Sequence, residues 1–122
     1  MKEGNVVQEK SYKFALDIVR LCSSLMGEKR EFVLSKRLLK SGTSIGANVE
    51  EAIGAQTRKD FYSKLNVAYK EARETHYWLR LLRDAGPLEQ IDTIKMLNEC
   101  EELLKIIGSI LKTLRSNQVF NS

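Results

Sequence analysis

FYSKLNVAYKEARETHYWLRLL, residues 61–82, repeats apolar or small side chains at alternating intervals of four and three residues. A heptad repeat of this kind, kept over three heptads, is typical of a helix that packs along one seam against other helices. Thr57 and Asp60 can form a capping box before it, and Gly86 can end it. The sequence therefore predicts one long helix over residues 58–84. Its seam consists of Phe61, Leu65, Ala68, Ala72, Thr75, Leu79 and Leu82.

A first helix is predicted upstream, over residues 6–26. Asn5 can cap its start, with Gln8 as the capping-box partner, and Gly27 can end it. Its apolar residues fall into two adjacent groups at helical spacing, so this helix can bury a wide face. The groups are Tyr12, Leu16, Val19 and Met26, and Phe14, Ile18, Leu21 and Leu25.

Two more helices are predicted, over residues 30–53 and 88–114. The second helix contains a stretch of small residues, 41–48, whose intrinsic helix propensity is poor. Helical periodicity on both sides of this stretch indicates that tertiary packing continues the helix through it. The fourth helix follows Pro87, which is favoured in a first helical turn.

The expected fold class is all-α, an antiparallel up-down-up-down four-helix bundle, because short connections make neighbouring helices antiparallel. At 122 residues the chain fits a single domain, 1–122, with residues 116–122 as a frayed tail. Four further apolar residues either complete the core of one bundle or exceed what it requires and serve self-association. They are Leu39, Tyr69, Trp78 and Val33.

Composition favours an ordinary globular protein, with 43% hydrophobic and 30% charged residues. Cys22 and Cys100 lie in apolar helical stretches without Cys-x-x-Cys spacing, so we expect buried free thiols and no metal. A signal peptide is not visible, and no apolar run approaches the roughly 20 residues that span a bilayer. We expect a cytoplasmic protein with no membrane contact.

Motifs for catalysis were sought around His76, the single histidine. No nucleophile or orienting acid stands at a spacing that would build a catalytic site, and no phosphate-binding glycine loop is present. Arg73, three residues before His76, rules out the Glu-x-x-His motif of di-iron bundles. The sequence predicts a non-enzymatic protein without a cofactor.

Basic side chains are the remaining candidates for function. The net charge is +4, and five of the basic residues lie within twelve positions at the start of the second helix. Such arrays can bind phosphates by releasing counterions, although a solvated helix face is the commoner explanation for charge on helices. The candidate nucleic-acid-binding residues are Lys29, Arg30, Lys36, Arg37, Lys40, Arg58, Lys59, Arg73 and Arg80.

The run SIGANVEEA, residues 44–52, resembles the Ser-Ile-x-x-Asn-Ile-x-Glu-Gly signature of the 23S rRNA intervening-sequence protein family, the bacterial "four helix bundle proteins". Ala52 replaces the usual glycine, Lys40 replaces an arginine, and Ser41 and Gly42 replace alanine-like residues. A second block, in the third helix, resembles the same family. The motif positions expected to be structural are Ser44, Ile45, Asn48, Glu51, Glu71, Glu74 and Trp78.

The resemblance implies a ring of four-helix bundles, a homopentamer, without enzymatic activity. The family is similar to the accessory variability determinant of diversity-generating retroelements, a basic pentameric barrel that binds nucleic acid and a reverse transcriptase. The function expected is an oligomeric module that binds RNA or DNA through basic surfaces. The alternative is a scaffold for a protein partner, such as a reverse transcriptase, with no nucleic-acid role.

Four polar motif residues form two pairs at the same spacing. Asn48 and Glu51 are three apart on the second helix, as are Glu71 and Glu74 on the third. We hypothesise that they meet where the small residues let the helices approach, and that they fix the helix register or a protomer interface. Replacing Asn48 by leucine would then disturb stability or assembly.

Overall fold

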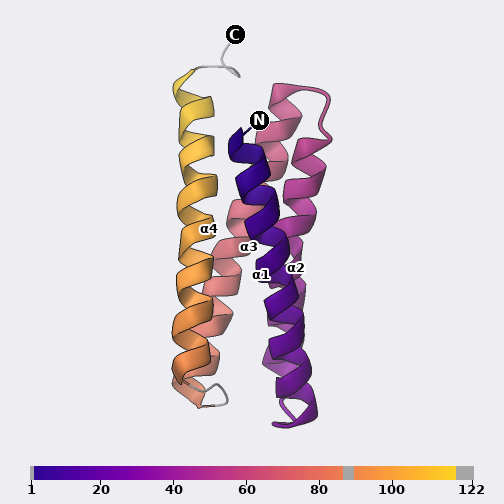
Figure 1. Cartoon of the computed structure of the whole chain (residues 1–122), viewed down its shortest axis with the longest axis vertical. Coiled ribbons are helices and arrows are strands. Elements are labelled where there is room, and N and C mark those ends of the chain that lie inside the picture. The colour runs from indigo at the N-terminus through magenta and orange to yellow at the C-terminus, as the bar shows by residue number, and fades with distance from the viewer. Residues whose placement is uncertain (1, 87–89, 118–122) are drawn as a thin grey trace.

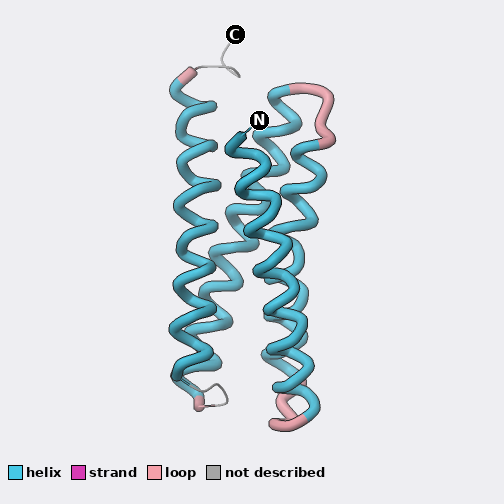
Figure 2. Tube along the Cα trace, viewed as in Figure 1, coloured by secondary structure: helices cyan, strands magenta, loops and turns pink. Residues whose placement is uncertain are grey.

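The computed structural model describes residues 2–86 and 90–117, which form four helices (Figure 1). They are α1 (Lys2–Gly27), α2 (Val33–Ile53), α3 (Arg58–Ala85) and α4 (Gln90–Ser116). Each helix packs against the next along the chain, and α4 also packs against α1. Figure 2 shows that the loops in the described part are confined to the ends of the bundle. The predicted antiparallel up-down-up-down four-helix bundle is therefore confirmed.

The start of α1 differs from the prediction. The helix begins at Lys2, so Asn5 lies inside it and does not cap it. Gln8 is not a capping partner either, because its Nε2 donates to both carboxylate oxygens of Glu50 on α2, at 2.9 and 3.1 Å. Gly27 was predicted to follow the helix as its C′ residue, but it is the last residue of α1, and among the described glycines only Gly86 has a positive φ.

The start of α2 lies three residues later than predicted. Arg30 has a φ of 57°, a left-handed conformation that a helix cannot continue. Glu31 then supplies the cap from outside the helix. Its carboxylate accepts from the backbone N–H groups of Leu34 and Ser35, at 3.0 and 2.8 Å, and from the Ser35 hydroxyl at 2.7 Å. Helix propensity does not predict the Glu31 cap, because Glu31 lies outside the helix that it caps.

The Glu31 cap makes stability depend on pH. Burial raises the pKa of the Glu31 carboxyl, but the hydrogen bonds from Leu34 and Ser35 outweigh it and lower the pKa below 4.5. A lowered folded-state pKa gives a stabilisation that is complete above the ordinary value and is lost as the pH falls through the folded value. We expect Glu31→Gln to cost about 1 kcal/mol at neutral pH.

Thermal melting of the Glu31→Gln variant and of the wild type, from neutral pH to below pH 4.5, checks this cap. The two melting temperatures should converge as the solution is acidified. Glu28→Gln is the matched control, because Glu28 is an exposed neighbour that makes no such cap. A gap between Glu31→Gln and wild type that stays constant with pH would contradict the assignment.

Both predicted caps of α3 are confirmed. The Thr57 hydroxyl accepts from the backbone N–H of Asp60 at 3.0 Å. Gly86 adopts a φ of 101°, and its N–H donates to the carbonyl oxygen of Leu82 at 3.2 Å. Pro87, Leu88 and residues 118–122 of the predicted tail lie outside the described residues, and α4 reaches Ser116 instead of ending at residue 114.

The core lies between the four seams. The α3 seam is buried as predicted, except that Phe61 is half-buried. Cys22 and Cys100 are free and fully buried, and burial raises the pKa of each thiol to about 12, which keeps it protonated. The fully buried large side chains are Val7, Phe14, Ile18, Leu25, Leu38, Ile45, Val49, Leu65, Leu79, Leu82, Leu103 and Ile107.

The extra apolar residues divide between core and surface. Leu39, Tyr69 and Trp78 are half-buried and pack against the core, whereas Val33 is 73% exposed. On α1, only one of the two apolar groups faces inward. Its other group leaves three side chains in solvent, which we call the α1 stripe, namely Tyr12, Leu16 and Val19.

The small-residue stretch of α2 is helical throughout, as predicted. Its polar side chains turn back onto their own helix: the hydroxyls of Thr43 and Ser44 donate to the carbonyl oxygens of Leu39 and Lys40, at 2.7 and 2.6 Å. Its glycines let α1 approach closely. A Cβ on Gly42 would stand 2.9 Å from two carbons of Ile18.

Candidate nucleic-acid interface

The candidate basic residues of the α1–α2 connection and of α2 are all exposed. Lys29 and Arg30 lie in the connection, and the Arg30 guanidinium carbon stands 5.6 Å from the centre of the Phe32 ring. Three more follow on the first two turns of α2, and we call them the α2 basic cluster: Lys36, Arg37 and Lys40. The carboxylate of half-buried Glu31 in this segment already accepts the hydrogen bonds that cap α2.

The register between α2 and α3 decides which other basic residues lie at the same level. The hydroxyl of Thr75 donates to that of Ser41 at 3.0 Å, inside the core. This bond sets the first half of α2 beside the second half of α3, so Arg73 and Arg80 belong to the same half of the bundle as the α2 basic cluster. The opposite end of the bundle, where α2 ends and α3 begins, can be followed in Figure 1.

Arg58 and Lys59 lie at that opposite end, at the start of α3. They are exposed, and they are separated from the α2 basic cluster by the length of α2. Within one protomer, these two residues and the α2 basic cluster therefore form two separate patches. Asp60, Glu50 and Glu51 lie near them in the chain or at the facing end of α2, so this end carries acidic as well as basic groups.

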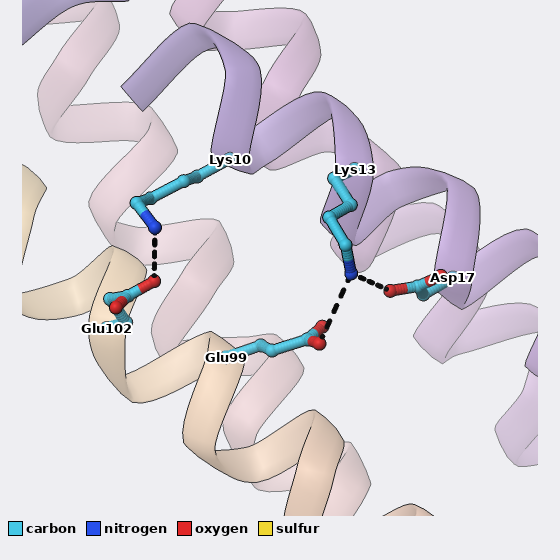
Figure 3. A network of polar contacts seen from close by, with 5 residues as sticks. All are labelled: Lys10, Lys13, Asp17, Glu99 and Glu102. Carbon is cyan, nitrogen blue, oxygen red and sulfur yellow. Dashed lines mark hydrogen bonds and ion pairs between the residues drawn. The ribbon is translucent and has the colours of Figure 1, made fainter. Parts of the chain in front are cut away.

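The face between α1 and α4 is neutralised by ion pairs (Figure 3). Lys10 pairs with Glu102 at 2.9 Å. Lys13 lies 2.9 Å from Asp17 on its own helix and 3.5 Å from Glu99. Much of the acidic charge of α4 is thereby directed at α1 lysines, and this face offers little net charge to a polyanion.

The α2 basic cluster differs from that face. Within the described residues, no carboxylate lies within 4 Å of Lys36, Arg37 or Lys40. Lys40 acts electrostatically on Glu71 of α3, but burial and the charge of Glu74 outweigh this effect and raise the pKa of Glu71. Three cations at the surface of α2 thus remain available to an external anion.

The motif residues of α2 bond mainly within the protomer. Ile45 is fully buried, and Ser44 is half-buried against its own helix. The side-chain amide of Asn48 donates to the carbonyl oxygen of Ser44 at 2.8 Å. Glu51 pairs with Lys64 of α3 at 3.1 Å. These residues therefore have partners other than the ones we hypothesised.

The motif residues of α3 differ in their burial. Glu71 is half-buried and Glu74 exposed, and neither hydrogen-bonds to Asn48 or Glu51. Within one chain Asn48 and Glu51 bond to Ser44 and Lys64 instead, and a role of the four groups in helix register or between protomers stays a prediction. Trp78 packs against the core, and its indole N–H is the one buried side-chain polar group without a hydrogen-bond partner among the described residues.

The two hydroxyl residues whose hydrogen bond fixes the register between α2 and α3 were not identified from the sequence. Ser41 and Thr75 are both buried and bond to each other. Cys22 adds a second link, since its thiol donates to the backbone carbonyl of Ser35 at 3.4 Å. A threonine inside the α3 heptad seam was the available signal, because a buried hydroxyl must find a partner.

His76 makes one polar contact. Its Nε2 lies 3.0 Å from a carboxylate oxygen of Glu101 on α4, and its side chain is 22% exposed. In the described part of the chain, no three His, Cys, Asp or Glu side chains are grouped so as to hold a metal ion. None of the described helices combines the length and apolarity that crossing a bilayer requires.

The comparisons with known proteins agree on one family. Residues 3–109 match the family described as 23S rRNA-intervening sequence protein. A crystal structure from Bacteroides thetaiotaomicron VPI-5482, of a protein of unknown function from the S23 ribosomal protein family, shares 48% sequence identity and superposes with a TM-score of 0.88. That similarity covers 90% of this chain and 98% of the other. Among proteins with curated descriptions, no relative is found. The chain therefore belongs to the 23S rRNA-intervening sequence protein family.

Proposed function

We propose that this protein is a non-enzymatic, oligomeric module that binds RNA through the α2 basic cluster. The single observation that carries the proposal is the contrast between two faces of the bundle. Lysines on the α1–α4 face are paired with α4 carboxylates, whereas Lys36, Arg37 and Lys40 have no carboxylate of the described residues within 4 Å. Unpaired surface cations are the groups that release counterions from a phosphate backbone.

Assembly strengthens this function. A net charge of +4 on one chain gives weak attraction, but the fields of several copies add. The α1 stripe supports self-association, because Tyr12 is 69% exposed and Leu16 and Val19 follow at helical spacing on the same side of α1. The assembly we propose is the homopentameric ring that the resemblance implies.

A second function is favoured by the same stripe. An exposed apolar strip on a helix can dock a protein partner as well as another copy. In this alternative the protein is a scaffold for a partner such as a reverse transcriptase, and nucleic acid has no role. The two functions differ in their response to salt, because phosphate contacts weaken steeply with ionic strength and apolar contacts do not.

Light scattering of the purified protein, with and without a mixed-sequence RNA at low and high salt, tests both parts. We expect a mass of five protomers that gains RNA at low salt and releases it at high salt. An oligomer that ignores RNA at every salt concentration would support the scaffold instead. A monomer that ignores RNA would overturn the assembly and the RNA-binding function together.

A further inference from the structure

A shallow hollow of about 540 Å³ lies on the surface between α3 and α4. It is lined by Arg73, Glu74, His76, Tyr77 and Arg80 of α3 and by Leu104 of α4. This volume falls in the range of small-ligand sites, about 300–1,000 Å³. The hollow is distinct from the α2 basic cluster, because its residues lie on the side of α3 that faces α4.

Tyr77 is the aromatic residue that lines this hollow. It is 47% exposed, so part of its surface is open to a ligand. Arg73 precedes it by one helical turn and Arg80 follows it by one, so both guanidinium groups emerge on the same side of α3. The Arg80 guanidinium carbon lies 5.8 Å from the centre of the Tyr77 ring.

The Tyr77 ring is held in place by Trp78, the next residue along α3. Tyr77 and Trp78 make an edge contact, with ring centres 5.0 Å apart and planes at 69°. Trp78 in turn packs against the core. On the α4 side, the contact between His76 and Glu101 ties the rim of the hollow to the neighbouring helix. A fixed aromatic ring loses little conformational freedom when a ligand stacks on it.

The charges of the hollow favour an anion. Among the described carboxylates, none lies within 4 Å of Arg73 or Arg80, and the nearby Glu101 is already engaged by His76. Glu74 is the one lining residue of opposite charge. Two guanidinium groups and one carboxylate therefore line the hollow, and Arg80 also interacts electrostatically with Asp84. The Cα atoms of the two arginines are about 10 Å apart along the helix axis.

We infer that Tyr77, Arg73 and Arg80 form a site for an unpaired nucleotide of single-stranded RNA. The base stacks on the Tyr77 ring, and the phosphates on either side of it pair with the two guanidinium groups. Aromatic rings and arginines together are the groups on which splayed bases are held, whereas a duplex keeps its bases inside the stack. This inference rests on the proposed RNA-binding function and adds the form of RNA that is bound.

The protein carries its own reporter for the test. Trp78 is the only tryptophan of the chain, and its ring contacts Tyr77. The experiment titrates the full-length protein with a single-stranded RNA that lacks self-complementarity, and separately with the duplex of the same sequence. Binding is followed by Trp78 fluorescence and by anisotropy of labelled RNA, for the wild type and for Tyr77→Ala, Tyr77→Phe and Ile94→Ala.

We expect Tyr77→Ala to bind the single strand roughly 10-fold more weakly, or worse, and to lose the Trp78 response. Its affinity for the duplex should stay near that of the wild type. Tyr77→Phe keeps the ring and should bind normally, and so should Ile94→Ala, which removes an apolar side chain of α4 that is 50% exposed and lies outside both the α1 stripe and the hollow. Circular dichroism melting of each variant confirms that it folds.

Two contrary results have different meanings. If the wild type binds the single strand and Tyr77→Ala binds it equally well, the nucleotide site is wrong while the RNA-binding function stands. If the wild type binds neither RNA at low salt, the proposed function fails, and this inference fails with it.

Discussion

Substitution of Gly42 by leucine should lower the free energy of unfolding by about 3 kcal/mol, the upper range for overpacking a core. A Cβ at position 42 would stand 2.9 Å from both Cγ1 and Cγ2 of Ile18, and leucine adds three more carbons beyond it. Ile18 is fully buried and β-branched, so those two carbons cannot swing aside. Helices α1 and α2 would have to move apart.

Urea unfolding followed by circular dichroism measures this loss. Gly27→Leu is the matched control, because a Cβ at that position meets nothing within 4 Å. Combining Gly42→Leu with Ile18→Ala tests the stated cause, since the combined loss should be smaller than the sum of the two single losses. Equal stabilities for Gly42→Leu and Gly27→Leu would mean that the close approach of α1 and α2 does not limit side-chain size.

Most of the fold was predictable because periodicity and caps are local properties of the chain. The α3 heptads, the Thr57 cap and the Gly86 terminus all follow from residues near one another in sequence. The small-residue stretch of α2 was also predicted to be helical, although its propensity is poor, because the periodicity on each side required it. Its stability comes from contact with Ile18, which the sequence does not place beside Gly42.

The errors arose where two signals competed for one boundary. Asn5 has the side chain of a good cap, yet α1 starts before it. Glutamate is less common as a helix cap than serine or asparagine. Glu31 nevertheless caps α2 from one residue before the usual cap position, because Arg30 takes a left-handed backbone conformation there. Cap assignment depends on the path by which the chain enters a helix, and composition does not report that path.

The candidate site was predictable only in part. The sequence shows which side chains are charged, but it does not show which basic side chains are paired with carboxylates in the fold. Lys10 and Lys13 look as available as Lys36 and Lys40 until α4 brings Glu102 and Glu99 beside the first two. The spacing of seven residues between Arg73 and Arg80 is enough to place both on one face of α3. Their place beside an exposed Tyr77, in a hollow completed by α4, depends on packing between helices.

Removal of the α2 basic cluster is expected to weaken RNA binding about 100-fold at ~0.1 M salt, if each of its three side chains contacts one phosphate. Each contact to a single strand contributes roughly 0.7 to the slope of log affinity against log salt, so three contacts contribute about 2. The slope for the triple variant Lys36→Ala, Arg37→Ala, Lys40→Ala should therefore be smaller than that of the wild type by about 2. Its fold should persist, because all three side chains are exposed.

The control must remove the same charge from the other face. Lys10→Ala, Lys13→Ala, Lys112→Ala takes away three exposed lysines of α1 and α4, two of which are paired with Glu102 and Glu99. Both triple variants have the same net charge, so a general electrostatic attraction would weaken their RNA binding equally. A local interface on α2 would weaken only the first, and anisotropy titrations at several salt concentrations distinguish the two. Equal affinities and equal salt slopes for both variants would show that RNA is attracted by total charge, and the α2 basic cluster would lose its assigned role.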